Sequence, residues 1–214
     1  AFKKVDEISK KLGEEWKYDD FYFIYSSTLL ALNKPEEAKK ISARGMALSE
    51  DSEAHLYYYY SCVMLNDSLK IKEAFNLIDE YSEKNLLSES DTERMKYILF
   101  LNGRDTLNAE IHARKSFELD RGNPINIFNL ANVLIRGRIN VNEGLELVDH
   151  LLTQSPDDFR YLWLKGVALF YNSSYSEALN ILNMAWEKTD AYNPELDNDI
   201  FKVKKAIEKR KSIY

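Results

Sequence analysis

Five small residues recur along the chain at almost constant spacing, each inside an apolar segment with helical periodicity. They are Ala38, Ala74, Ala109, Gly144 and Ala178, with gaps of 36, 35, 35 and 34 residues. A second small or polar residue lies roughly twelve residues before most of them, namely Ser26, Ser61, Ala131 and Gly166, with Tyr97 as the exception. A repeat of about 34 residues that contains two helices is typical of stacked helical hairpins. The spacing therefore predicts an all-α chain whose core grows by the addition of repeats.

The composition agrees with helices and excludes several classes of function. The 214 residues include only 7 Gly and 4 Pro, which favours helices joined by short polar turns. The net charge of -6 disfavours a nucleic-acid-binding protein, because such proteins usually carry a basic patch or domain. A single cysteine, Cys62, excludes an internal disulfide framework and a multi-cysteine zinc site. Since no apolar stretch reaches the roughly 18–20 residues of a membrane helix, we expect no membrane insertion.

The repeat pattern predicts one continuous domain over residues 1–214. Residues 1–18 resemble the second half of a leading repeat, and the segment after the last full repeat is a C-terminal capping helix. The predicted boundaries are 1–18 for the partial leading repeat, 19–53, 54–89, 90–123, 124–158 and 159–192 for the five repeats, and 193–214 for the capping helix.

The predicted capping helix has one apolar stripe and polar remaining faces, as the end of a stack of repeats requires. Asn193 is placed to cap its N-terminus, and Pro194 suits its first turn. Its stripe consists of Leu196, Ile200, Val203 and Ile207.

The best-preserved unit, 159–190, resembles the tetratricopeptide repeat (TPR). Its residues at the characteristic positions of that motif are Leu162, Gly166, Leu169, Ala178, Leu182 and Ala185. The unit before it supplies Ala131, Leu134, Gly144, Val148 and Leu151. The resemblance implies a right-handed α-solenoid of stacked antiparallel helix pairs. In that fold the small residues let the two helices of a repeat approach closely.

The resemblance also implies a concave groove lined by the first helix of each repeat, at its second, fifth, ninth, twelfth and thirteenth positions. Carried onto this chain, the candidate partner-binding residues are Phe23, Tyr58, Arg94, Phe128, Asn132 and Trp163. Tyr, Trp and Arg are the residue types that most often dominate binding energy. The alternative is that the aromatic residues only fill the space between neighbouring first helices. We do not predict recognition of a chaperone tail, because the lysines that would accompany Asn129 and Asn132 are not in register.

No motif points to catalysis, a cofactor or a metal. His55, His112 and His150 do not lie in metal-ligand motifs, and no nucleotide-binding or nucleophile-elbow sequence occurs. We therefore predict no catalytic, cofactor-binding or metal-binding residues. An enzyme built on a helical array is the least favoured hypothesis.

The sequence is best explained as a non-enzymatic scaffold that binds a protein or peptide segment in its groove. The alternative is a ligand-sensing or regulatory TPR portion of a larger signalling or transcription-regulating protein, since the chain begins in the middle of a repeat. Formation of a homo-oligomer is left open. Asn-, Lys-, Ile- and Tyr-rich composition suggests a bacterial origin. A cytoplasmic location is favoured, and a periplasmic one would follow if an upstream signal had been removed.

Overall fold

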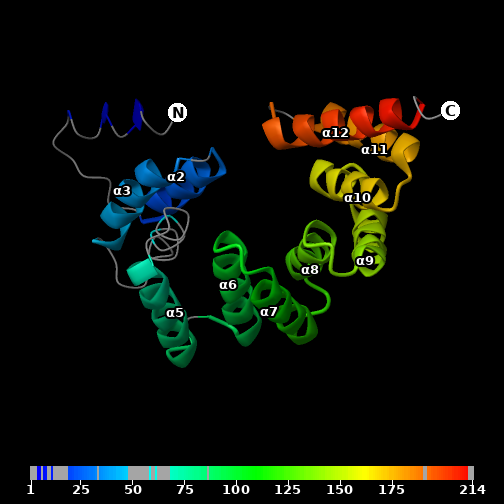
Figure 1. Ribbon diagram of the computed structural model, residues 1–214. Helices are drawn as coiled ribbons and strands as arrows, with labels where there is room; N and C mark the ends of the chain where they lie inside the picture. The colour runs from blue at the N-terminus through cyan, green and yellow to red at the C-terminus, as the bar shows by residue number, and fades with distance from the viewer. Residues whose placement is uncertain are drawn as a thin grey trace. The chain divides into compact units, whose positions relative to one another are not determined.

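The computed structural model (Figure 1) describes residues 4–5, 7–8, 11, 19–32, 34–47, 58, 61, 68–85, 87–189 and 192–211. Every element of regular structure within these residues is an α-helix, so the all-α fold class is confirmed. The chain divides into two compact units, Ala1–Asp105 and Thr106–Tyr214, and each is described by itself. Since the division falls inside the predicted repeat 90–123, the single continuous domain and its repeat boundaries stay predictions.

The first unit contains α2 (Asp19–Ala31), α3 (Pro35–Met46), α5 (Ser68–Glu83) and α6 (Glu89–Asn102). Helices α2 and α3 pack against each other, and α5 packs against α6. The small residues Ser26 and Ala38 are fully buried in the first of these pairs. Most of the predicted leading segment 1–18, and most of the first helix of the predicted repeat 54–89, lie outside the described residues.

The second unit is a continuous series of helices. It contains α7 (Thr106–Leu119), α8 (Pro124–Arg136), α9 (Val141–Gln154), α10 (Phe159–Tyr171), α11 (Tyr175–Lys188) and α12 (Pro194–Lys211). Each helix packs against the next, and α10 also contacts α8 and α12 (Figure 1). Helices α8 with α9, and α10 with α11, form the hairpins that the repeat pattern predicts.

Four of the described turns between consecutive helices have the same hydrogen bond. A backbone N–H donates to the carbonyl oxygen five residues earlier, at 2.9–3.0 Å, from Lys34 to Leu29, from Asp105 to Phe100, from Ile139 to Leu134 and from Ser174 to Leu169. Arg104, Arg138 and Ser173 have positive φ in three of these turns. At Arg138 and Ser173 the left-handed residue reverses the chain within three or four residues, and the helices on either side of it, α8 with α9 and α10 with α11, pack against each other.

Side-chain caps begin several of the helices. Asn123 caps α8, Asn140 caps α9 and Asp158 caps α10. At the start of α12 the side-chain oxygen of Asn193 accepts hydrogen bonds from the backbone N–H groups of residues 195 and 196, both at 3.1 Å. The predicted cap of this helix is therefore confirmed, and such caps satisfy N–H groups that have no partner within the helix.

The small residues lie where paired helices come closest. A Cβ atom added to Gly166 of α10 would lie 2.6 Å from the Leu182 side chain of α11 and 3.4 Å from the Ala178 carbonyl oxygen. A Cβ atom added to Gly144 of α9 would lie 2.5 Å from Ile135 and 3.1 Å from the carbonyl oxygen of Ala131, both in α8. In these two hairpins a glycine thus faces an alanine of the partner helix, and an added Cβ atom would overlap with a neighbouring side chain.

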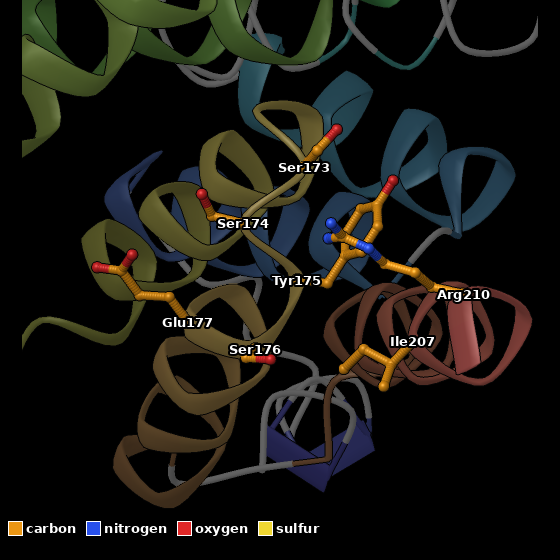
Figure 2. A pocket seen from close by; sticks show the side chains of 7 residues that line it. All are labelled: Ser173, Ser174, Tyr175, Ser176, Glu177, Ile207 and Arg210. Carbon is orange, nitrogen blue, oxygen red and sulfur yellow. The ribbon is translucent and has the colours of Figure 1, made fainter. Parts of the chain in front are cut away.

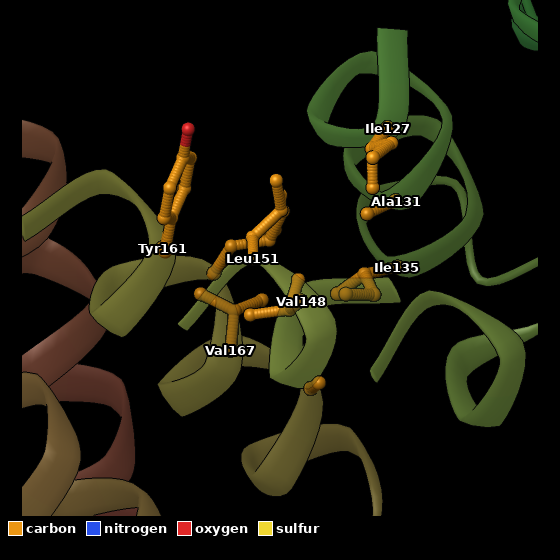
Figure 3. Close-up of a cluster of buried hydrophobic side chains, with 9 residues drawn as sticks. Ile127, Ala131, Ile135, Val148, Leu151, Tyr161 and Val167 are labelled. Atoms are coloured by element: carbon orange, nitrogen blue, oxygen red, sulfur yellow. The ribbon is translucent and has the colours of Figure 1, made fainter. Parts of the chain in front are cut away.

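Two clusters of buried side chains form the core of the second unit. The first connects α8, α9 and α10 (Figure 3) and contains Ile127, Ala131, Ile135, Val148, Leu151, Tyr161, Leu164, Val167 and Ala168. The second connects α10, α11 and α12 and contains Leu162, Leu169, Ala178, Leu182, Ala185, Leu196, Ile200 and Val203. The predicted apolar stripe of α12 is therefore confirmed, with Ile207 partly buried beside it. Phe201, on another face of α12, is 63% exposed, which the sequence analysis did not anticipate.

Changing Gly166→Ala should lower the free energy of unfolding by about 1–2 kcal/mol, as measured by urea denaturation. The steric overlap with Leu182 destabilises the fold by more than the higher helix propensity of alanine stabilises it. Gly122→Ala is the matched control, because its added Cβ has no neighbour closer than 3.9 Å. Equal stability of the two variants would contradict the assigned role of close approach.

Arg114 of α7 links its helix to α9. Its guanidinium donates to both oxygens of Glu143, at 2.6 and 2.9 Å, and also to Glu110, at 2.6 Å. The hydrogen bonds from Arg114 lower the pKa of Glu143 below its ordinary value of 4.5. Because the pKa is lower in the folded state, the carboxylate stabilises the fold above the unfolded-state pKa. That contribution is lost as the pH falls through the folded-state value.

Glu143→Gln should therefore lower the free energy of unfolding at pH 7 by about 0.5–1 kcal/mol, a modest loss because both side chains are roughly one third exposed. The difference from wild type should shrink as the pH falls below about 4.5 in thermal or urea denaturation. Glu146→Gln, an exposed position on the same helix, serves as the control. A difference that persists undiminished at pH 3 would assign the effect to packing.

Candidate functional site

Helices α8, α10 and α12 present neighbouring surfaces on the second unit, since α10 contacts both of the others. We call this surface the first-helix face, and define it by Phe128, Asn132, Arg136, Trp163 and Asp199. Three of these residues, Phe128, Asn132 and Trp163, are candidate residues from the sequence analysis. The other two come from the structure.

Trp163 lies at the centre of the first-helix face and connects all three helices. Its indole Nε1 donates a hydrogen bond of 2.9 Å to Oδ2 of Asp199 in α12. The guanidinium carbon of Arg136, in α8, lies 4.6 Å from the centre of its ring. The same arginine approaches Asp199 Oδ2 to 3.6 Å. Cation–π contacts and charge-assisted hydrogen bonds of this kind each contribute about 1 kcal/mol or more, so the three groups hold one another in place.

Asp199 is the largely buried charge of this network. Its side chain is 14% exposed, and its second oxygen accepts a hydrogen bond of 2.9 Å from Lys202. A buried carboxylate is stable only when donors surround it. The indole N–H, the ammonium and the nearby guanidinium provide them.

Phe128 and Asn132 are both half-buried on α8. The Phe128 ring packs against Tyr161, with 5.7 Å between ring centres, at the edge of the first core cluster. Phe128 therefore packs between α8 and α10, and its role in partner binding stays a prediction. Its half-buried side chain still leaves part of its surface exposed.

The remaining candidates belong to the first unit. Arg94 in α6 is largely buried and pairs with Asp91 of the same helix. The Lys39 ammonium lies 5.6 Å from the centre of the half-buried Tyr58 ring. Phe23 belongs to α2, and its side chain lies outside the described residues. A single groove that includes these three residues stays a prediction.

A small cavity opens beside the first-helix face, between the end of α10 and the middle of α12. Its volume is about 110 Å³, and its lining consists of Arg138, Val167, Phe170, Tyr171, Leu182, Asp199, Lys202 and Val203. The guanidinium carbon of Arg138, in the turn after α8, lies 4.5 Å from the centre of the Tyr171 ring. The cavity thus has an apolar wall, two positively charged residues, Arg138 and Lys202, and one carboxylate, Asp199, which is paired with Lys202.

A larger hollow of about 660 Å³ lies beside the turn between α10 and α11 (Figure 2). It is lined by Ser173, Ser174, Tyr175, Ser176, Glu177, Ile207 and Arg210. None of the predicted candidates lines it. Its polar groups are exposed hydroxyls with one carboxylate and one guanidinium, an arrangement without a buried reactive group.

The described part of the chain contains neither a candidate metal centre nor a candidate membrane-spanning helix. No group of three or more histidine, cysteine, aspartate or glutamate side chains is arranged to hold a metal ion there. None of the described helices combines the length and the hydropathy needed to cross a membrane.

The sequence analysis missed Arg136, Asp199, Arg138 and Lys202. A signal for Arg136 was present, because it occupies the thirteenth position of its repeat, one of the positions that the resemblance assigns to the groove. Tyr171 occupies the same position in the next repeat. Asp199 and Lys202 lie in the capping helix, where the repeat register was not applied.

No protein-family model matches the chain, and no curated protein matches it in sequence. Solved structures of low sequence identity do match it. A tetratricopeptide repeat protein from Parabacteroides merdae gives a TM-score of 0.62 at 14% identity, covering 99% of this chain and 80% of its own. Yeast Tom70 gives 0.63 at 13% identity, covering 98% of this chain and 43% of its own.

A third solved structure is YrrB, described as a TPR protein with an unusual peptide-binding site. It gives a TM-score of 0.52 at 18% identity, covering 94% of this chain and 98% of its own. Likeness at this level of identity concerns the backbone arrangement. Together with the helix pairs, the small-residue contacts and the shared turns described above, it shows that the chain has the fold of the tetratricopeptide-repeat proteins.

Proposed function

We propose that the chain is a non-enzymatic scaffold that binds a protein or peptide segment on the first-helix face. The observation that carries the proposal is the network of Arg136, Trp163 and Asp199, which joins three helices on one surface. The side chains of a surface held in this way lose little conformational freedom when a partner binds. The entropic cost of binding is therefore smaller and the affinity is higher.

The residue types on this face support the same function. Trp and Arg are the residues most often found at binding hot spots, where a large side chain meets a partner in a desolvated position. Half-buried Asn132 adds an amide that can both donate and accept hydrogen bonds. The combination suits an extended or helical peptide, for which apolar burial supplies affinity and polar groups supply selectivity.

The comparison with YrrB supports a peptide or protein as the class of ligand, because that protein of the same fold has a peptide-binding site. Only the ligand class is carried over. The residues proposed for this chain come from its own first-helix face.

Trp163→Ala should weaken binding of the physiological partner at least tenfold, because it removes both the ring and the hydrogen bond to Asp199. The partner would first be identified by cross-linking and mass spectrometry with the immobilised wild-type chain. Affinity for that purified partner would then be measured by biolayer interferometry. Trp163→Phe keeps an aromatic ring, and its affinity should lie between those of wild type and Trp163→Ala.

Trp186→Ala provides the matched control, since this tryptophan lies on α11, a second helix, and is 36% exposed. It should change the affinity by less than about threefold. Circular dichroism spectra would establish that all variants remain helical. Loss of binding in Trp186→Ala with full binding in Trp163→Ala would overturn the proposal, as would a catalytic turnover that these variants abolish.

A further inference from the structure

The cavity beside Trp163 has the size of one amino-acid side chain. Its volume of about 110 Å³ is somewhat smaller than an engineered cavity of roughly 150 Å³ that accommodates benzene. Val167, Phe170, Leu182 and Val203 supply apolar lining. An aliphatic side chain of valine or leucine size fits such a space and gains free energy by leaving water.

The net charge around the cavity is opposite in sign to the net charge of the whole chain. Among the described residues of this surface, Arg136, Arg138 and Lys202 are positive and Asp199 is negative, a local excess of two positive charges. The whole chain has a net charge of -6. A positive patch on an acidic protein attracts an acidic partner and steers it to that patch.

Arg138 is the group best placed to meet such a partner. It is exposed, it lies over the Tyr171 ring, and within the described part of the chain no carboxylate pairs with it. The contact with the Tyr171 ring positions the guanidinium at the cavity. Lys202, which also lines the cavity, is 52% exposed and forms an ion pair with Asp199.

We infer that the first-helix face selects an acidic segment in which an aliphatic side chain enters the cavity and a neighbouring Asp or Glu pairs with Arg138 or Lys202. This inference rests on the proposed function and names its class of partner. The anion is a side-chain carboxylate next to the aliphatic residue. A nucleic acid, which also carries negative charge, has no aliphatic side chain to fill the cavity.

The test uses four sets of twelve-residue peptides, all amidated at the C-terminus so that no terminal carboxylate contributes. One set combines Asp or Glu with Leu or Val, and a second replaces the aliphatic residues with Ser. The third replaces the acids with Asn or Gln, and the fourth replaces them with Lys. Biolayer interferometry on the full chain should give the first set affinities at least about tenfold higher than the other three. Raising the salt concentration should weaken the first set most.

The double variant Arg138→Gln with Lys202→Gln should weaken the acidic aliphatic set about tenfold and leave the Asn/Gln set unchanged. The matched control is Arg121→Gln with Lys204→Gln. Arg121 is also an exposed turn arginine beside an aromatic ring, and Lys204 is an exposed lysine of α12 outside the cavity lining. The control removes the same charge and should stay within about twofold of wild type.

The outcomes separate this inference from the proposed function. Failure of the acidic aliphatic set to bind, equal binding of all sets, or equal losses in the two double variants would overturn the inference. The proposed function would still stand if the purified partner remained sensitive to Trp163→Ala. A fluorescein-labelled twelve-nucleotide single strand serves as the last probe. Its binding, lost in Arg138→Gln with Lys202→Gln and accompanied by no peptide binding, would overturn both.

Discussion

The close approach of paired helices at a glycine or an alanine is the contact on which the rest of the structure depends. In one hairpin Gly166 faces Leu182 and Ala178, and in the other Gly144 faces Ile135 and Ala131. Neither position has room for an additional Cβ atom. Dense packing at these points sets the distance between helices and lets the larger apolar side chains around them interdigitate.

The first-helix face is a consequence of that packing. Once α10 is fixed against α11, and α12 against both, Trp163 reaches a carboxylate 36 residues later in the chain. Asp199 accepts its N–H at the cost of leaving water, and that cost is offset because Lys202 and Arg136 also approach the carboxylate. The polar network therefore depends on one defined axial register of the three helices. A shift of one helix would leave a buried charge with too few donors.

The candidate site was predictable in part. The repeat register placed Trp163 and Phe128 on the first helices, and extending it to the thirteenth position would have included Arg136. It could not separate their roles, because Phe128 packs against Tyr161 of α10 whereas Trp163 contacts a carboxylate of α12 and a guanidinium of α8. The role of Asp199 could not be predicted from the register, since α12 departs from the repeat sequence. The cavity could not be predicted either, because its lining comes from a turn and three helices.

The sequence by itself determined the local elements and their repetition. Small residues at intervals of 34 to 36, capping side chains such as Asn193, and the apolar stripe of α12 act locally. Their contacts are with neighbours a few residues away or with one adjacent helix. Only the tertiary structure decided which side chains of different hairpins would meet. The stack of Arg136 on Trp163, the pairing with Asp199 and the charged residues around an apolar cavity join residues from different hairpins. Sequence periodicity indicates which side chains each helix buries. Contacts between helices of successive repeats depend instead on the axial register of the helices and on side-chain conformations, and both are set by the packed core.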